Sequence, residues 1–137
     1  MNRDGMDLAA VLIRKKDIVF AGANRPVIWF DHKNEMHELK PTKTAVGGSH
    51  IENVTVESLS LKKEDVQQLF LFSDGFADQF GGPEGKKLMV SRFKLWLNQI
   101  ISLNSDEQLL FLEKNFLDWK KTIEQVDDVM VIGIKVS

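Results

Sequence analysis

The spacing of apolar residues changes once along the chain, and this change limits the possible folds more than any other feature. The first half contains short apolar runs that are separated by polar, glycine or proline residues, a pattern typical of strands. These runs predict strands at 8–13, 18–21, 27–30, 54–61 and 67–72. Because short turns separate the first three runs, they predict an antiparallel meander.

From Leu88 onward the apolar residues recur three or four positions apart, which predicts two amphipathic helices. One face of the first carries Met89, Phe93, Trp96, Leu97, Ile100 and Ile101. The second is predicted to begin at Ser105, which has capping-box spacing to Gln108. Its predicted buried residues are Leu109, Leu112, Phe116 and Trp119. Alternation returns at 129–136 and predicts a last strand, so the order of elements indicates an α+β domain with an antiparallel sheet and packed helices.

Composition limits the class of protein. The chain has 137 residues, 43% of them hydrophobic, with 18 basic and 20 acidic side chains, which fits one soluble domain with a modest core. This near balance of charge predicts no nucleic-acid partner and no membrane contact, and we expect a cytoplasmic location. The sequence contains no cysteine, which excludes thiolate chemistry and leaves oxygen or imidazole ligands for any metal.

Acidic residues stand at the ends of two predicted strands. Asp74 and Gly75 follow the strand at 67–72, and Asp127 and Asp128 precede the last strand. If these strands are neighbours, Asp74 and Asp127 would face one another and repel unless a cation lay between them. Mg2+ and Mn2+ prefer such oxygen ligands. Asp-Gly is also ordinary turn chemistry, and the spacing alone favours a turn and a solvated strand end.

Three segments in order carry a family resemblance: "DGMDLAAVLI", "FLFSDGFADQFGG" and "VDDVMVIGIKV". They resemble the later motifs of the metal-dependent protein serine/threonine phosphatases of the PPM (PP2C) type, and most of all their bacterial SpoIIE/RsbU-like branch. The segments "FAGANRPVIWF" and "KTAVGG" also resemble that branch, so the likeness covers essentially the whole chain. The resemblance implies part of the α-β-β-α sandwich of these enzymes.

The resemblance also implies a metal site. It makes Asp74 and Asp127 ligands of a two-metal centre, with Gly75 allowing Asp74 its pose, and it makes Asp78 a ligand of a third, weaker metal. The positions implied are Asp74, Asp127, Asp78 and Gly75, with Asp128, Asp4 and Asp7 as lesser candidates. The implied cofactor is Mn2+ or Mg2+, and no side chain is expected to act as nucleophile, because a metal-activated water attacks phosphorus in such sites.

The implied activity is hydrolysis of phosphoserine or phosphothreonine on a regulatory protein that resembles an anti-sigma-factor antagonist. The early Gly-Asp-x-x-Asp and Asp-Gly-x-Gly motifs have no counterpart here, so residues 1–137 are expected to be the C-terminal portion of the phosphatase domain, behind sensor or membrane segments. We therefore expect weak metal binding and low activity from the chain alone. Uncovered sheet edges predict a homodimer. The alternative is a non-catalytic protein-interaction module.

Two other groups of residues have a functional and an ordinary explanation. His32, His37 and His50 fall in predicted turns or loops and are interpreted as surface residues. Lys86 and Lys87 could attract a phosphoprotein, but a solvated pair before a helix is the simpler interpretation.

Overall fold

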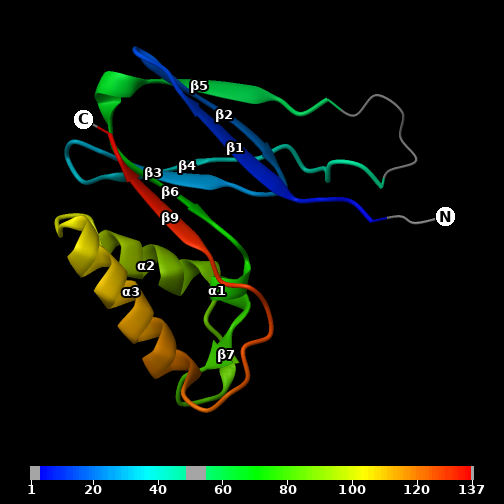
Figure 1. The fold of residues 1–137 in the computed structure, drawn as a ribbon, viewed down its shortest axis with the longest axis vertical. Helices are drawn as coiled ribbons and strands as arrows, with labels where there is room; N and C mark the ends of the chain where they lie inside the picture. Colours follow the sequence, from blue (N-terminus) through cyan, green and yellow to red (C-terminus); the bar gives the residue numbers. More distant parts are fainter. Residues whose placement is uncertain (1–3, 49–54, 137) are drawn as a thin grey trace. The chain divides into compact units, whose positions relative to one another are not determined.

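The computed structural model describes residues 4–48 and 55–136 (Figure 1). The chain divides into two compact units: unit 1 comprises 1–71 and 134–137, and unit 2 comprises 72–133. In chain order the elements are β1 (Leu8–Ile13), β2 (Asp17–Ala23), β3 (Val27–Asp31), β4 (Met36–Leu39), β5 (Ser58–Lys62), the 3-10 helix η1 (Lys63–Asp65), β6 (Val66–Phe72), α1 (Gly75–Asp78), β7 (Phe80–Gly81), β8 (Lys86–Lys87), α2 (Val90–Ile100), α3 (Ser105–Lys120) and β9 (Val131–Lys135).

Unit 1 is built on two antiparallel sheets, with strand orders β1-β2-β5 and β4-β3-β6-β9. The predicted meander is therefore correct for β1 and β2 but wrong for β3, which pairs with β4 and β6 in the other sheet. The cause lies in the connection after β2. Asn24 has a positive φ of 59°, and Pro26 follows it without a backbone donor for a continuing ladder.

The core of unit 1 takes residues from both sheets. In β2 the alternation of the sequence puts Ile18 and Phe20 inside, with exposed fractions of 2% and 1%. Together with residues of the second sheet they form one cluster: Ile18, Phe20, Val27, Val66, Leu69 and Val136. Two sheets that share a core in this way form the β-β part of the α-β-β-α sandwich that the resemblance implied.

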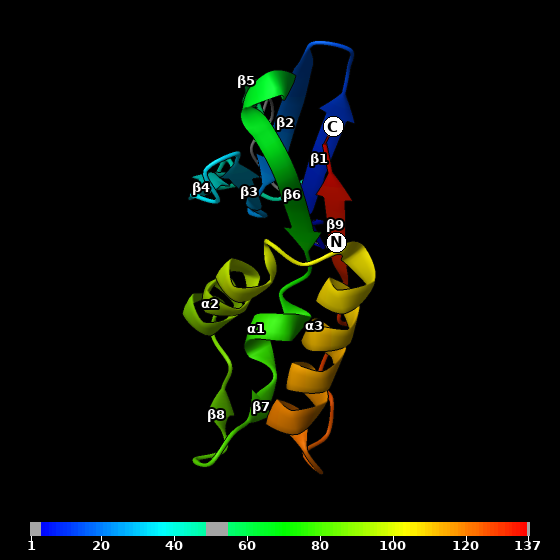
Figure 2. The same ribbon diagram turned by 90° about the vertical axis from the view of Figure 1, so that its left-hand side faces the viewer.

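Unit 2 packs three helices around Phe76. This buried residue of α1 contacts Phe93 of α2 and Phe116 of α3, with ring centroids 4.9 and 5.0 Å apart. Figure 2 shows α1 between the two longer helices. The α+β class with antiparallel sheets and packed helices is thus confirmed. In the described part of the chain, no helix has the length and hydropathy needed to span a bilayer.

The long helices differ from prediction in their details. The capping residue of α3 is Asn104 and not Ser105: its side chain accepts from Glu107 N at 2.9 Å, and Glu107 accepts from Asn104 N at 3.1 Å. Leu109 is 64% exposed, whereas Gln108 takes a buried position. Met89 is also exposed, because it precedes α2 with a φ of 73° and lies outside the helical period.

The short elements were the least predictable. The sequence did not predict β4, α1, β7 or β8, each of which has four residues or fewer. Strand β5 begins at Ser58, later than the expected 54–61, and residue 54 lies outside the described residues. The described part of the segment 40–53 is mostly irregular, with isolated bridges at Thr42 and Val46.

Candidate metal site

The ends of β6 and β9 lie side by side in unit 2, and Ser73 joins them. Its backbone N–H donates to Met130 O at 2.9 Å, and its hydroxyl donates to Asp128 O at 2.9 Å. The same hydroxyl accepts a hydrogen bond from Met130 N at 3.0 Å. The sequence left open whether the two acid-bearing strands are neighbours, and these bonds and the strand order show that they are.

Gly75 lets the segment that follows β6 approach the segment that precedes β9 closely. A Cβ atom at this position would lie 2.2 Å from the carbonyl oxygen of Asp128 and 3.3 Å from Val129 Cγ2. No real side chain tolerates the first distance, so the position requires glycine. Gly75 is the first residue of α1 and has no positive φ, so its role here is close packing and not a left-handed turn.

Asp74 stands between Ser73 and Gly75, the two residues that contact Asp128. It precedes α1, is exposed, and makes no side-chain capping bond. Asp127 is exposed as well, and its Oδ1 accepts from Asp128 N at 2.7 Å. Among the described residues, none of these three carboxylates has an ion pair with a basic side chain. Two adjacent segments therefore present three uncompensated carboxylates to solvent.

The carboxylates at this place are of the type that binds a hard divalent cation, but among the described residues the three ligand atoms that lie within 4.8 Å of one another are those of Asp31, Glu35 and His37 and not those of Asp74, Asp127 and Asp128. Carboxylate oxygens at a solvent-facing edge suit Mg2+ and Mn2+, which keep several waters and need only a few protein ligands. Asp74 and Asp127 or Asp128 would hold the ion, and Ser73 and Gly75 would fix the spacing of the two segments. The assignment of these residues as ligands stays a prediction.

The accessory candidates have other partners. Asp78 ends α1, and its Oδ1 lies 3.5 Å from Lys87 Nζ in a half-exposed pair. Such pairs contribute little, so a cation could displace Lys87 at small cost. Asp4 and Asp7 belong to unit 1 and are exposed, and Asp7 Oδ1 accepts from Asn24 Nδ2 at 3.0 Å.

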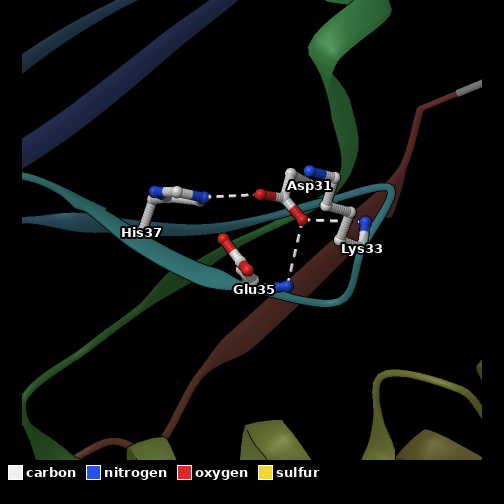
Figure 3. Close-up of polar contacts among 4 residues, drawn as sticks. All are labelled: Asp31, Lys33, Glu35 and His37. Atoms are coloured by element: carbon white, nitrogen blue, oxygen red, sulfur yellow. Dashed lines mark hydrogen bonds and ion pairs between the residues drawn. The ribbon is translucent and has the colours of Figure 1, made fainter.

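A second group of potential ligands lies in unit 1, on the β3–β4 hairpin (Figure 3). One ligand atom each of Asp31, Glu35 and His37 lie within 4.8 Å of one another. His37 Nε2 donates to Asp31 Oδ2 at 2.8 Å, and Asp31 Oδ1 accepts from Lys33 N at 2.8 Å and Glu35 N at 3.0 Å. The hydrogen bond from His37, followed by the backbone N–H groups, lowers the pKa of Asp31 against the opposing effect of partial burial.

The interpretation of His37 as a surface residue in a turn or loop was wrong. His37 belongs to β4, is partly buried, and stacks on Trp29 with ring centroids 4.2 Å apart. The pairing of Trp29 with His37 across the hairpin explains the contact. The sequence signal that could have found it is the polar turn at 31–35 between apolar residues, which is typical of a hairpin.

Comparisons with known proteins identify the fold. The SiaA-PP2C domain of Pseudomonas aeruginosa superposes with a TM-score of 0.79 at 23% identity, over 90% of this chain and 48% of that one. Stp1 of Staphylococcus aureus, a serine/threonine phosphatase, gives 0.62 at 14% identity over 96% and 56%. The phosphatase domain of SpoIIE from Bacillus subtilis gives 0.59 at 14% over 97% and 58%.

The chain therefore has the fold of PP2C-type bacterial phosphatase domains, as its motifs predicted, and it spans about half the length of the domains that it matches. The family comparison gave no match, and neither did the comparison with curated proteins.

Proposed function

We propose that this chain supplies one acidic wall of a metal-dependent phosphatase centre that hydrolyses phosphoserine or phosphothreonine on a regulatory protein. One observation carries the proposal. Ser73 and Gly75 hold the Asp127–Asp128 segment against Asp74, and the three carboxylates lack cationic partners among the described residues. This arrangement occurs in a chain with the fold of serine/threonine phosphatases of the PP2C type.

Each residue of the wall has a defined part in this proposal. Asp74 and Asp127 supply carboxylate oxygens from the two segments, and Asp128 is the reserve donor. Ser73 bonds to both Asp128 and Met130 and so fixes the separation of the segments. When bound, Mn2+ or Mg2+ would supply Lewis-acid activation of water and neutralise the charge of the phosphoryl group.

The chain corresponds to only part of the phosphatase domains that it matches, and this affects the activity that we expect from it. The chain spans about half of each matched phosphatase domain. We therefore propose that these carboxylates are only part of the ligand set and that the chain by itself binds Mn2+ weakly and turns over slowly. An added ligand from the rest of such a domain would raise the affinity, because each metal needs several oxygen donors.

The test is Mn2+-dependent hydrolysis of p-nitrophenyl phosphate by the chain and by a form extended at its N-terminus. Asp74→Asn removes one charge of the wall with little change in shape, and Asp31→Asn is the matched control in unit 1. We expect hydrolysis in the extended form that Asp74→Asn abolishes and Asp31→Asn preserves. If Asp74→Asn leaves hydrolysis unchanged, the proposal is wrong. If neither form binds Mn2+ or hydrolyses the substrate, the non-catalytic interaction module is the better account.

A further inference from the structure

Unit 2 carries a groove of about 530 Å3 between the β7–β8 hairpin and α2, with Trp119 of α3 in its wall. Its size is that of sites that take a small ligand or a few side chains of a peptide. Arg92, Lys86 and Lys87 line the groove against a single acid, Glu84. The charge of the lining is thus positive in a chain whose net charge is −2.

Trp119 is held rigidly at the side of this groove. Its indole Nε1 donates to Gln79 O at 3.0 Å, and its own carbonyl oxygen accepts from Gly82 N at 2.9 Å. A Cβ atom on Gly82 would lie only 2.6 Å from the ring, and one on Gly81 would lie 2.0 Å from Trp119 O. The glycine pair therefore allows the hairpin to press against the indole, and the ring has a fixed position.

Arg92 is poised to bind an anion. Its guanidinium lies 4.6 Å from the centre of the Trp119 ring. Stacking uses the face of the guanidinium and leaves its N–H groups at the edge free to bind a carboxylate or phosphate in bidentate fashion. Because Trp119 is fixed, the arginine loses less conformational entropy on binding than a free surface side chain would.

Lys86 and Lys87 can also leave their present ion-pair partners and pair with an incoming acid. Lys86 pairs with Glu84 at 2.6 Å, but both side chains are at least 70% exposed, so the pair is weak. Lys87 pairs with Asp78 at 3.5 Å and so connects the groove to α1, the helix that follows Asp74. An incoming acidic side chain could take over either lysine.

The groove also offers apolar contacts. Met89 is 57% exposed and Leu95 is 61% exposed, and both line the groove. Exposed apolar side chains beside cations suit a peptide that carries both acidic and apolar residues. They suit a nucleic acid less well, because Arg92 and the backbone at Gly82 already cover the indole on which a base would stack.

We propose that this groove, the Arg92–Trp119 groove, binds an acidic segment with an apolar residue in the protein substrate, next to its phosphorylated residue. This inference rests on the proposed phosphatase function for the identity of the partner. It gives Lys86 and Lys87 a role in docking that the simpler interpretation, a solvated pair, does not.

The test measures binding without catalysis, by titrating the chain with short unphosphorylated peptides and following amide NMR shifts and tryptophan fluorescence. One peptide contains glutamates around a leucine, a second replaces the glutamates by glutamine, and a third replaces the leucine by serine. We expect the first to bind and the others to bind about tenfold and about threefold more weakly, with shifts confined to β7, β8, the start of α2 and Trp119.

Two variants test the residues themselves. Arg92→Gln removes the charge and is expected to weaken binding of the first peptide about tenfold. Lys114→Gln, an exposed lysine of α3 outside the groove, removes the same charge and is expected to change nothing. Circular dichroism melts of both variants confirm that they fold.

Equal binding of the glutamate and glutamine peptides, equal losses in the two variants, or tighter binding of an oligonucleotide in the groove would overturn the inference. Because the peptide titrations contain no metal, their outcomes do not test the phosphatase centre. If Asp74→Asn abolishes Mn2+-dependent hydrolysis but no peptide binds, the groove proposal is wrong and the proposed phosphatase function stands.

Discussion

Two groups of acidic side chains in this protein differ in the bonds they make. On the hairpin of unit 1, Asp31 accepts hydrogen bonds from His37 and from two backbone N–H groups. On the wall of unit 2, Asp74 makes no side-chain capping bond and, among the described residues, no ion pair. Acids that already accept hydrogen bonds stabilise a turn, whereas exposed acids without an ion pair are those that gain from a metal.

The hairpin and the wall are also held in place by different kinds of contact. The hairpin holds its acids by side-chain contacts, including the stack of Trp29 on His37. The wall is held by the Ser73 hydroxyl and by the absence of a Cβ at Gly75, which fix the backbone, and its carboxylates have no ion pair among the described residues. Variants that disturb the wall should therefore change stability through the backbone and metal affinity through the carboxylates, as two separable effects.

The largest effect is expected from Gly75→Ala. The added methyl group meets the carbonyl oxygen of Asp128 and forces the two segments apart, which should lower the free energy of unfolding by about 2 kcal/mol. Gly47→Ala, where no atom lies within 4 Å of the added group, should cost only the strain of a positive φ, about 1 kcal/mol. Denaturant unfolding of both variants compares them. Equal losses would mean that Gly75 has no packing role.

The next effect concerns the charge of the wall. Asp74→Asn should reduce the affinity for Mn2+ at least about tenfold, because a direct ligand is lost, and should change the stability of the metal-free chain by less than about 0.5 kcal/mol. Isothermal titration with Mn2+ measures the first and thermal melts the second. Asp31→Asn is the control, and a larger loss of Mn2+ affinity there would reverse the comparison between the two regions.

Ser73→Ala should have a smaller effect on stability. It removes two hydrogen bonds, one donated to Asp128 O and one accepted from Met130 N, for a cost of about 1 kcal/mol. The carboxylates remain, so Mn2+ affinity should fall only because the spacing of the segments is less well fixed. Ser73→Thr, which keeps the hydroxyl, should restore both properties. If alanine and threonine behave alike, the hydroxyl does not join the segments.

The smallest effect belongs to the hairpin and depends on pH. The pKa of Asp31 is lower in the folded protein than in the unfolded chain, where it is about 3.9. The ionised carboxylate therefore stabilises the fold at pH values above about 3.9, and this contribution is lost as the pH falls from there through the folded-state pKa. His37→Gln should raise the pKa of Asp31 toward its usual value and flatten this part of the stability profile. Carboxyl NMR titration measures it. The pKa of Asp17, lowered mainly by its hydrogen bond with Arg14, should stay unchanged as the internal control.

Much of the fold could be predicted from the sequence where the pattern was long. The runs of β1 and β6 and the helical spacing of α2 each extend over enough residues for a period to be recognised. The sheet to which β3 belongs could not be predicted, since strand pairing depends on distant contacts. The capping residue of α3 was missed by one position because Asn104 and Ser105 are both good capping residues.

The candidate site divides in the same way. The acids at the termini of β6 and β9 indicated a shared site only if the two strands are neighbours, and the strand order shows that they are. The role of Ser73 and the packing reason for Gly75 could not be predicted, because both depend on a backbone carbonyl of a segment that is distant in sequence. The Arg92–Trp119 pair was hidden for the same reason, since it joins two helices.

Whether the carboxylates of Asp74, Asp127 and Asp128 bind metal is tested most directly by titrating the isotope-labelled chain with Mn2+ and following two-dimensional amide NMR spectra. Paramagnetic Mn2+ broadens the signals of amides near the place where it binds. We predict that amides at 73–78 and 127–130 broaden first, while those of the β3–β4 hairpin broaden only at much higher Mn2+ concentration. If the hairpin around Asp31, Glu35 and His37 broadens first, the metal site lies in unit 1 and the account of the wall is contradicted.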